Sequence, residues 1–400
     1  MNVIYLTYDG LLDPLGDSQI LPYIRKIRPN VSSYTIISFE KDHWRNEDFI
    51  NKEQELKSYG INWIQVRFSS SQSSYGKIYD LIKMYLVLLN ALFFSKIDLI
   101  HARGHPAGSV ALTFKKIFKF KLVFDFRGLW ADERVTKQGW NLDISSHRLQ
   151  YRYYKSREKK LFIHSDHVIV LTEAVLQDIL LNHEVPTEKF TVIPCAADFD
   201  HFNIIPVDNQ DIGFQKNTFL VGYLGSIGPM YQFDAYLKLV KYFNEYDANA
   251  FGLIVTKDTS SAKSEIAELL GEEYLKLFKI VNSDRERVPK FINHMSVLVA
   301  FYTISYSVIS VSPTKIGEAL ACGVSIIANK GIGDTDQIIK QINSGLIIEN
   351  TSDDILQSTP ERFMNLKVSS RIQIRDRSNT TFGLDCAAKK YISIYESLRS

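Results

Sequence analysis

Short apolar runs alternate along the whole chain with longer segments in which apolar positions recur at helical spacing. This alternation predicts strand–helix–strand units and parallel sheets. Runs with the length of strands occupy residues 3–8, 34–39, 61–66, 97–102, 122–126, 167–171 and 190–193 in the first half. In the second half they occupy residues 219–224, 251–255, 279–282, 297–301, 324–328 and 345–349. We therefore expect an α/β protein made of two doubly wound domains.

The alternation is interrupted after Pro194. Residues 195–216 are rich in Asp, Asn, Pro and Gly, a composition typical of a linker. We expect an N-terminal Rossmann-like domain over residues 1–200 and a C-terminal one over residues 201–383, followed by a helix at 384–400. Ligands of doubly wound domains bind at the carboxyl ends of the strands, so residues that follow strands are the candidates for chemistry.

The composition is that of an ordinary soluble enzyme, with 45% hydrophobic residues, 23% charged residues and a formal net charge of +2. This low net charge argues against a dedicated nucleic-acid-binding protein. Residues 101–160 are nevertheless basic, with 14 Lys and Arg against 5 Asp and Glu. Such a surface attracts phosphate-bearing partners, and its densest cluster, residues 115–121, alternates lysines with large apolar groups.

Other features of the sequence indicate the compartment. Three cysteines without paired spacing fit a reducing environment. Met1 leads directly into the first expected strand, so we expect no signal peptide. The most apolar helical stretch, residues 84–94, is too short to cross a bilayer. These features predict a cytoplasmic protein that can lie on the inner face of a membrane through its basic segment.

One stretch combines a helix start with candidate phosphate-binding groups. Ser312 is a good N-cap, Pro313 fits the first helical position, and the N–H groups from Thr314 onward then point out of the positively polarised helix end. Lys315 adds a full charge, and Glu318 lies one turn deeper on about the same face. The stretch predicts a nucleoside diphosphate clamp in which the carboxylate binds the ribose hydroxyls. The alternative is an ordinary capped helix.

The whole string, Ser-Pro-x-Lys-x-x-Glu leading into Ala-Cys-Gly at Gly323 and then a strand, resembles the donor-site segment of the family 4 glycosyltransferases. These enzymes have the GT-B fold, and the resemblance covers nearly the whole chain. It implies two Rossmann-like domains facing across a cleft, with the last helix returning to the first domain. It also implies retention at the anomeric carbon. The sequence departs from the family at Ser310, where a first glutamate is expected eight positions before Glu318.

Glycine-containing loops follow the first expected strand of each domain. Gly16 suits a loop that lets an acceptor or donor phosphate approach, although a turn alone can require glycine. In the second domain, Gly225, Ser226 and Gly228 form a possible phosphate cradle, although every such domain needs a tight first turn. By resemblance, the backbone near Val288 contacts the nucleobase.

Charged side chains follow two neighbouring expected strands of the first domain. His101, Arg103 and His105 lie at or just past the end of one strand and could orient an acceptor phosphate, although lone histidines are usually structural. Asp125 ends the next strand, and a carboxylate after so apolar a run must find a partner or face a cleft. Arg127 could be that partner in a purely structural ion pair. By resemblance, we assign Asp125, with Arg127, to positioning the sugar or to the acceptor base.

Two acidic pairs match the Asp-x-Asp metal signature of another glycosyltransferase fold. Asp198 and Asp200 fall in the expected linker, and Asp334 and Asp336 begin an expected helix, so neither pair follows a strand. We therefore predict no metal and no other cofactor.

The sequence as a whole predicts a glycosyltransferase. It would move a sugar from a nucleoside diphosphate sugar to a hydroxyl of a glycan or lipid-linked glycan. One alternative is a degenerate GT-B protein that binds a nucleotide sugar or glycan without turnover, which Ser310 favours. Another is a sugar-nucleotide epimerase of the same fold.

Overall fold

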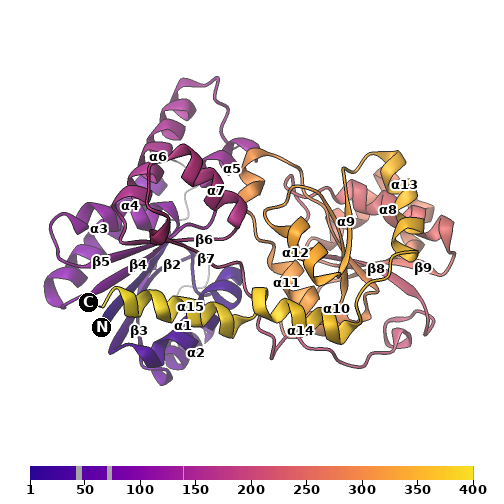
Figure 1. The fold of residues 1–400 in the computed structure, drawn as a ribbon, viewed down its shortest axis with the longest axis horizontal. Helices are drawn as coiled ribbons and strands as arrows, with labels where there is room; N and C mark the ends of the chain where they lie inside the picture. Colours follow the sequence, from indigo (N-terminus) through magenta and orange to yellow (C-terminus); the bar gives the residue numbers. More distant parts are fainter. Residues whose placement is uncertain (42–46, 70–73, 138, 400) are drawn as a thin grey trace. The chain divides into compact units, whose positions relative to one another are not determined.

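The computed structural model describes residues 1–41, 47–69, 74–137 and 139–399. The chain divides into two compact units (Figure 1), of which the first contains Met1–Pro194 with Leu384–Ser400 and the second is Cys195–Gly383. The chain therefore enters the second unit after Pro194, rather than at residue 200, and leaves it after Gly383. Each unit contains its own parallel sheet, which confirms the expected architecture of two α/β domains.

The first unit is built on a sheet of seven parallel strands in the order β3-β2-β1-β4-β5-β6-β7. The strands are β1 (Asn2–Thr7), β2 (Ser33–Glu40), β3 (Ile61–Arg67), β4 (Leu99–Arg103), β5 (Lys121–Asp125), β6 (His167–Val170) and β7 (Phe190–Val192). The helices are α1 (Leu21–Ile27), α2 (Glu47–Ser58), α3 (Ser74–Phe94), α4 (Gly104–Lys115), α5 (Trp130–Thr136), α6 (Ser145–His164), α7 (Glu173–Asn182) and α15 (Leu384–Ser397), with short helical turns η1 (Gly16–Ile20), η2 (Arg28–Asn30) and η3 (Thr187–Lys189).

Helices cover both faces of this sheet (Figure 1). Helix α4 packs against α3 and α6 over one face, whereas α1 packs against α15 over the other. Helix α15 comes last in the sequence and buries Tyr391 and Tyr395. The C-terminal helix is thus part of the core of the first unit.

The strand order places the candidate chemistry at one point of the sheet. Connections run outward in opposite directions from the adjacent strands β1 and β4, which makes this pair the topological switch point. The register sets Thr7 beside Arg103, and Arg103 beside Asp125, at the carboxyl ends of β1, β4 and β5. Side chains that leave these three strand ends are therefore close neighbours.

The second unit is built on a sheet of six parallel strands in the order β10-β9-β8-β11-β12-β13. The strands are β8 (Phe219–Leu224), β9 (Ala250–Val255), β10 (Phe278–Val281), β11 (Val297–Ala300), β12 (Ser325–Asn329) and β13 (Gly345–Ile348). The helices are α8 (Phe233–Tyr246), α9 (Thr259–Leu269), α10 (Val288–His294), α11 (Thr314–Ala321), α12 (Thr335–Ile342), α13 (Asp353–Met364) and α14 (Arg371–Phe382), with short turns η4 (Asn209–Ile212), η5 (Glu272–Leu277) and η6 (Tyr306–Ser310).

The segment expected to be a linker is part of the second unit. Ala197, Phe199 and Phe202 are buried in its core, beside residues of α11 and β12. The guanidinium of Arg375 donates to the carbonyl oxygens of Phe199 and Phe202, at 2.6 Å each. The linker interpretation was wrong because these two aromatic side chains anchor an otherwise polar segment.

Helix α11 starts one residue later than the sequence predicted. Its first residue is Thr314, and Pro313 occupies the N-cap position in an extended conformation, without a side-chain cap. The hydroxyl of Ser312 instead accepts a hydrogen bond from the N–H of Cys195 at 3.1 Å. The predicted cap was wrong because this hydroxyl binds another segment. The predicted glycine stop is confirmed, since Gly323 follows the helix with a φ of +70°.

None of the helices in the described part of the chain has the length and apolar character needed to cross a membrane.

Candidate active site

Asp125 is the centre of a charge cluster at the carboxyl edge of the first sheet. Its carboxylate is buried and lies 3.5 Å from Arg127 Nη1, 3.6 Å from Arg103 Nη1 and 3.6 Å from His101 Nε2. Burial alone would raise the pKa of Asp125, but Arg127, His101 and Arg103 together hold it well below its usual range. Asp125 is therefore a carboxylate at any physiological pH.

The two arginines of this cluster have further partners. Arg103 Nε lies 3.3 Å from the carboxylate of Asp9, in the loop after β1. Arg127 Nη2 lies 3.5 Å from the amide oxygen of Gln19. Asp9 and Asp125 thus balance the charges of Arg103 and Arg127, so the cluster lacks the positive excess that the sequence suggested for these strand ends.

His101 is held by the C-terminal helix. Its Nδ1 lies 2.7 Å from the hydroxyl of Tyr395, and its ring stacks on Tyr391 with centroids 5.5 Å apart. These two tyrosines of α15 fix the ring so that Nε2 faces Asp125. Sequence reasoning missed both tyrosines, since they are separated from His101 by almost 300 residues and follow no motif.

The structure does not bring His105 to this cluster. The residue lies in the first turn of α4, and its Nε2 is 2.8 Å from the buried carboxylate of Glu158 on α6. Lys155 binds the other oxygen of Glu158 at 2.5 Å. Burial raises the pKa of Glu158, but His105 and Lys155 outweigh it and lower the pKa overall. His105 therefore joins α4 to α6.

Gly16 is required by the packing of its own loop. A Cβ atom at this position would overlap the carbonyl oxygen of Leu11. The loop is also held by the buried carboxylate of Glu40, which accepts hydrogen bonds from the N–H groups of Leu11 at 2.9 Å and Leu12 at 3.2 Å. This geometry accounts for the glycine without a ligand.

In the second unit, Lys315 lies among tyrosine rings at the start of α11. Its Nζ is 4.2 Å from the ring centroid of Tyr231, 5.1 Å from that of Tyr223 and 5.8 Å from that of Tyr302. Burial lowers the pKa of Lys315 to about 8, against a smaller opposing effect of Glu318. No carboxylate among the described residues lies within ion-pair distance of this ammonium group.

The glycine loop after β8 adjoins this lysine. Gly225 has a φ of +115°, and a Cβ atom there would lie 3.4 Å from Lys315 Nζ, so the backbone and the ammonium group are close neighbours. Within the described chain, the N–H groups of Ser226 and Gly228 donate to no protein acceptor. The loop and Lys315 together present N–H donors and a cation on the same side of the sheet.

Glu318 lies in α11, one turn after Lys315, and pairs with an arginine from the loop before α10. The carboxylate is 7% exposed, and Arg285 Nη1 lies 3.2 Å from its Oε1. Burial raises the pKa of Glu318, although Arg285 opposes the shift. The guanidinium of Arg285 also lies 5.3 Å from the ring centroid of Phe202. The sequence predicted a nucleobase contact near Val288 but gave no indication that Arg285 pairs with Glu318.

The remaining predicted donor-site residues lie at the starts of α11 and α10. Thr314 is its first residue and is half-buried. Val288 is the first residue of α10 and packs against the hydrophobic core of this unit. Ser310 is buried, and its hydroxyl donates to the carbonyl oxygen of Ser307 at 2.7 Å. The position of the family's first glutamate is thus occupied by a short side chain that bonds within its own turn.

Both Asp-x-Asp pairs stabilise local backbone. Asp198 accepts from the N–H of Asp200 at 3.0 Å, and Asp336 accepts from the N–H of Gly331 at 3.2 Å. Over the described ranges, no group of three or more His, Cys, Asp and Glu side chains is arranged to hold a metal ion.

The structure thus places strand-end charges in one doubly wound unit and a cationic helix start beside a glycine loop in the other. Two family models match consecutive parts of this sequence. Glycosyltransferase Family 4 matches residues 45–201, and Glycosyl transferases group 1 matches residues 205–378. The chain therefore belongs to the GT-B glycosyltransferases, in which these two domains are paired. No curated protein sequence matches the chain significantly.

Solved structures with the same fold span the whole chain. Anabaena Alr3699/HepE, crystallised with UDP and glucose, is 14% identical with a TM-score of 0.71, over 99% of this chain and 100% of that one. Sucrose-phosphate synthase (tll1590) from Thermosynechococcus elongatus is 14% identical with a TM-score of 0.68, over 100% and 99%. WaaG, a glycosyltransferase involved in lipopolysaccharide biosynthesis, is 15% identical with a TM-score of 0.68, over 98% and 99%. At these identities the likeness is one of fold.

Proposed function

We propose that this glycosyltransferase moves a sugar from a nucleoside diphosphate sugar to an acceptor hydroxyl. The observation that carries the proposal is the ammonium group of Lys315, which faces the Gly225 loop without a carboxylate partner among the described residues. A cation placed beside free N–H donors is suited to a diphosphate. Anabaena HepE was crystallised with UDP-glucose, which supports a donor of this class.

The donor would be held by residues of the second unit. Lys315 and the N–H groups at the start of α11 would bind the diphosphate, and Glu318 would accept from the ribose hydroxyls. Further donor-binding residues in this proposal are Ser226, Gly228, Val288, Ser312 and Thr314. Negative charge grows on the leaving diphosphate during transfer, and fixed cations and N–H donors stabilise it without reorganisation.

Asp125 would position the donor sugar or act as the acceptor base, with Arg127 orienting its carboxylate. Since the other partners of Asp125 are Arg103 and His101, these two residues would set the acceptor side of the site. We propose retention at the anomeric carbon, on the ground of family membership. The acceptor would be a glycan or a lipid-linked glycan at an anionic membrane surface, as in the biosynthesis of cell-surface polysaccharides.

The experiment is to incubate the protein with a panel of nucleotide sugars, to follow slow hydrolysis, and to measure nucleotide affinity. Glu318→Ala should weaken binding about 10-fold or more, because a hydrogen bond to a charged group contributes about 1.5–3 kcal/mol. Glu272→Ala, at an exposed position of the same unit, is the matched control. Equal affinity of Glu318→Ala and wild type for every nucleoside diphosphate, with unchanged melting, would contradict the proposed clamp.

Transfer should not require a divalent metal, because Lys315 and the helix-end N–H groups already offset the charge of the leaving group. Activity should therefore be the same in EDTA and in magnesium or manganese. Loss of activity in EDTA that either metal restores would show that a carboxylate of this chain binds a metal ion.

A protein that binds nucleotide sugars without turnover is the second candidate. It is favoured by Ser310, which stands where the family has its first glutamate and whose buried hydroxyl bonds to the carbonyl oxygen of Ser307. Tight nucleotide binding by the wild type with no hydrolysis or transfer from any donor of the panel would support this candidate.

A further inference from the structure

Helix α3 of the first unit is apolar on two opposite faces. Met84, Leu88 and Leu92 are buried against the rest of the unit, at 0%, 0% and 8% exposure. On the opposite face, Leu86 and Phe93 are 61% and 67% exposed. Ile78, Tyr79, Ile82 and Phe94 extend this outer face, with 50–83% exposure. An ordinary surface helix is polar on its outer side, so this face departs from the usual pattern.

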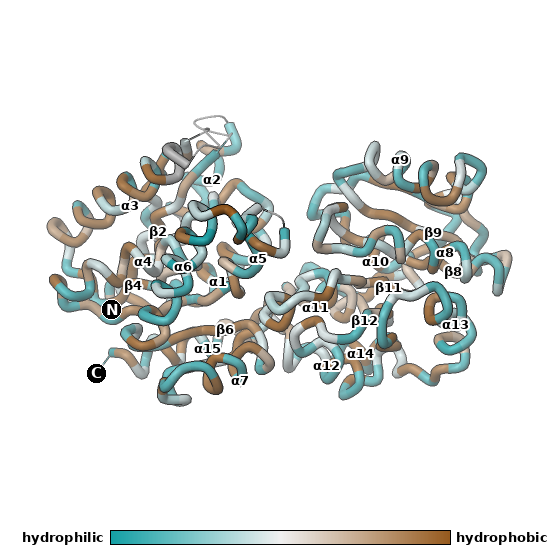
Figure 2. Tube along the Cα trace, turned by 90° about the horizontal axis from the view of Figure 1, so that it is seen from above, coloured by the Kyte–Doolittle hydropathy of each residue, from teal (hydrophilic) through white to brown (hydrophobic). Residues whose placement is uncertain are grey.

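The outer face also lacks acidic groups. The one carboxylate of α3, Asp80, is buried and binds Lys83 at 2.7 Å. Figure 2 shows the hydrophobic colouring along most of α3. The helix has 21 residues, which corresponds to about 30 Å of length. It therefore presents a long apolar stripe without negative charge in its described side chains.

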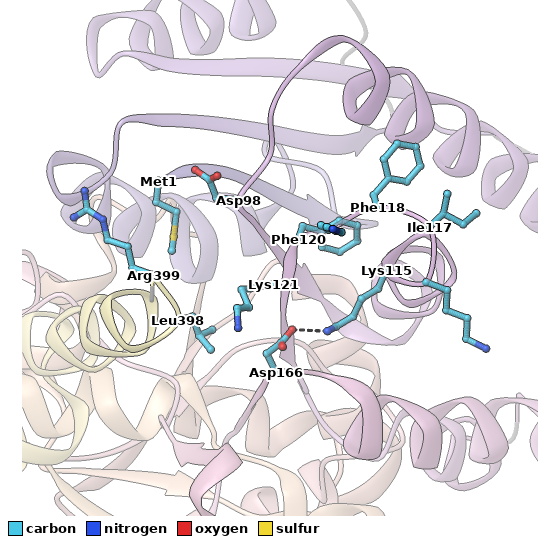
Figure 3. Close-up of a pocket in the computed structure, with 12 residues that line it drawn as sticks. Met1, Asp98, Lys115, Ile117, Phe118, Phe120, Lys121, Asp166, Leu398 and Arg399 are labelled. Atoms are coloured by element: carbon cyan, nitrogen blue, oxygen red, sulfur yellow. Dashed lines mark ion pairs between the residues drawn. The ribbon is translucent and has the colours of Figure 1, made fainter.

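A basic surface continues from the end of this stripe. The ring of Phe93 meets that of Phe118 edge-on, with centroids 5.5 Å apart, and the neighbouring Ile117 is 71% exposed. Lys116 and Lys119 are exposed beside these residues, and none of the described carboxylates lies within ion-pair distance of either. A hollow of about 660 Å³ opens here, lined by residues 115–121 and also by Asp98 and Asp166, of which Asp166 pairs with Lys115 at 2.8 Å (Figure 3).

Helix α3 connects this basic surface to the edge of the sheet that carries Asp125. The hollow lies at the amino ends of the strands, since Lys121 begins β5 and Asp98 precedes β4. The other end of α3 lies at the carboxyl edge, where Asp80 binds the hydroxyl of Tyr8 at 3.1 Å, directly after β1. A partner surface that covers the whole length of α3 would therefore extend from this hollow to the carboxyl edge of the sheet, where Asp125 lies.

We propose that the outer face of α3, with Ile117 and the lysines around it, docks on an anionic lipid bilayer. Apolar side chains along the helix would enter the headgroup region, and Lys96, Lys116 and Lys119 would face the lipid phosphates. Charge complementarity selects this occupant, because the exposed cations border an apolar stripe that has no carboxylate in its described part. This inference depends on the proposed function in one respect: docking would deliver a lipid-linked acceptor to the carboxyl edge of the sheet.

The test is cosedimentation of the full chain with vesicles of phosphatidylcholine, alone or mixed equally with phosphatidylglycerol. The wild type should bind the anionic vesicles at low salt, and added salt should weaken binding. Leu86→Ser and Phe93→Ser should each weaken it about 10-fold or more, because each removes a large side chain from the interface. The double change Lys116→Glu, Lys119→Glu should cost at least as much.

Matched controls separate docking from general hydrophobicity. Leu181→Ser and Ile372→Ser replace side chains that are 85% and 65% exposed on other helices, and should bind vesicles like the wild type. Wild-type protein that ignores anionic vesicles, or Leu86→Ser and Phe93→Ser variants that bind normally, would overturn the proposal. So would a dimer that forms in solution and is abolished by these two changes, because a second copy would then cover the face.

Nucleotide affinity distinguishes failure of this inference from failure of the proposed function. Leu86→Ser and Phe93→Ser should leave nucleoside diphosphate affinity unchanged, because the proposed donor residues belong to the other unit. Vesicle binding by a protein that binds no nucleotide would support docking and contradict the proposed function. Nucleotide binding without vesicle binding would contradict docking and leave the proposed function standing.

Discussion

Lys315, the proposed diphosphate ligand, lies in an environment that strongly shifts its pKa. Three tyrosine rings lie within 6 Å of its ammonium group, and burial brings the pKa of Lys315 down to about 8. The rings still attract the cation through their π faces. A bound diphosphate would favour the charged form, so donor binding and protonation of this lysine are expected to be coupled.

Nucleoside diphosphate affinity should therefore depend on pH around 8. Below this pKa, Lys315 is already charged and affinity should be constant. Above it, binding must take up a proton, and affinity should fall about tenfold per pH unit. Lys315→Arg keeps the charge at all these values and should remove the dependence. Titration calorimetry below and above pH 8 measures the nucleotide affinity of the wild type and of Lys315→Arg. Equal dependence of affinity on pH in the two proteins would contradict the prediction.

Asp125 is the matching case in the first unit. Asp125→Asn should lower the free energy of unfolding by about 3 kcal/mol, because buried Arg103 and the adjacent Arg127 lose their shared carboxylate. Since the folded-state pKa of Asp125 is lowered, its contribution is complete above about pH 4 and declines as the pH falls below that value. Denaturant titrations of both proteins at neutral and acidic pH test this.

Measurements of sugar transfer and of nucleotide affinity separate a catalytic role of Asp125 from a structural one. Sugar transfer should be lost while nucleotide affinity stays intact, since the proposed donor residues lie in the second unit. A variant with wild-type stability at neutral pH would show that the cluster contributes nothing to folding.

The candidate site was only partly predictable from the sequence. Asp125, Lys315 and Glu318 could be chosen because each lies at a strand end or helix start within a recognisable string. Arg285 was not assigned to Glu318 because their contact joins the loop before α10 to helix α11, 33 residues away. His105 was grouped with His101 and Arg103 because it lies just past the strand end, but the chain turns into α4 at Gly104 and the side chain contacts Glu158 of α6.

At the scale of elements, the apolar runs were sufficient to locate the strands. Parallel strands are covered on both faces, so they form continuous apolar runs with sharp ends. The start of α11 was less predictable, because Ser312 could serve either the helix or a distant segment, and only tertiary contact decides between them. The apolar outer face of α3 was not predicted either, because a helix with apolar residues on two opposite faces does not reveal from its sequence which face is exposed.

The turn η1 supplies a test of packing at this scale. Gly16→Ala should destabilise the first unit by about 1–3 kcal/mol, because the added methyl overlaps the backbone of Leu11. Gly228→Ala adds the same atom where no neighbour lies within 4 Å and should change stability by less than about 0.5 kcal/mol. Denaturant unfolding of the two variants compares them. Equal stabilities would mean that the loop before η1 relaxes freely.

At the scale of the molecule, the first unit is assembled from both ends of the chain. Helix α15 contributes Tyr391 and Tyr395 to its core, and Tyr395 also binds His101. Removing residues 384–400 should therefore lower the unfolding temperature of the first unit while nucleotide binding by the second persists. Calorimetric unfolding with and without nucleotide separates the two units. An unchanged unfolding temperature of the first unit would show that α15 adds little to its stability.

The control for this truncation is a smaller change at the same contact. Tyr395→Phe keeps the ring but removes the hydroxyl that lies 2.7 Å from His101, and should cost only about 1 kcal/mol. A cost close to that of the truncation would assign the stability to the hydrogen bond instead of the buried surface of the helix.

The discontinuous first unit also has a consequence during synthesis. A ribosome that has completed residue 194 must add about 190 more residues before α15 appears. At about 5–20 residues per second, this takes roughly 10–40 s. During that interval the nascent first sheet is complete, but the surface around Tyr34 and His101 lacks the helix that later covers it. This face is where a chaperone would engage the growing chain, and the second unit can fold before the first is finished.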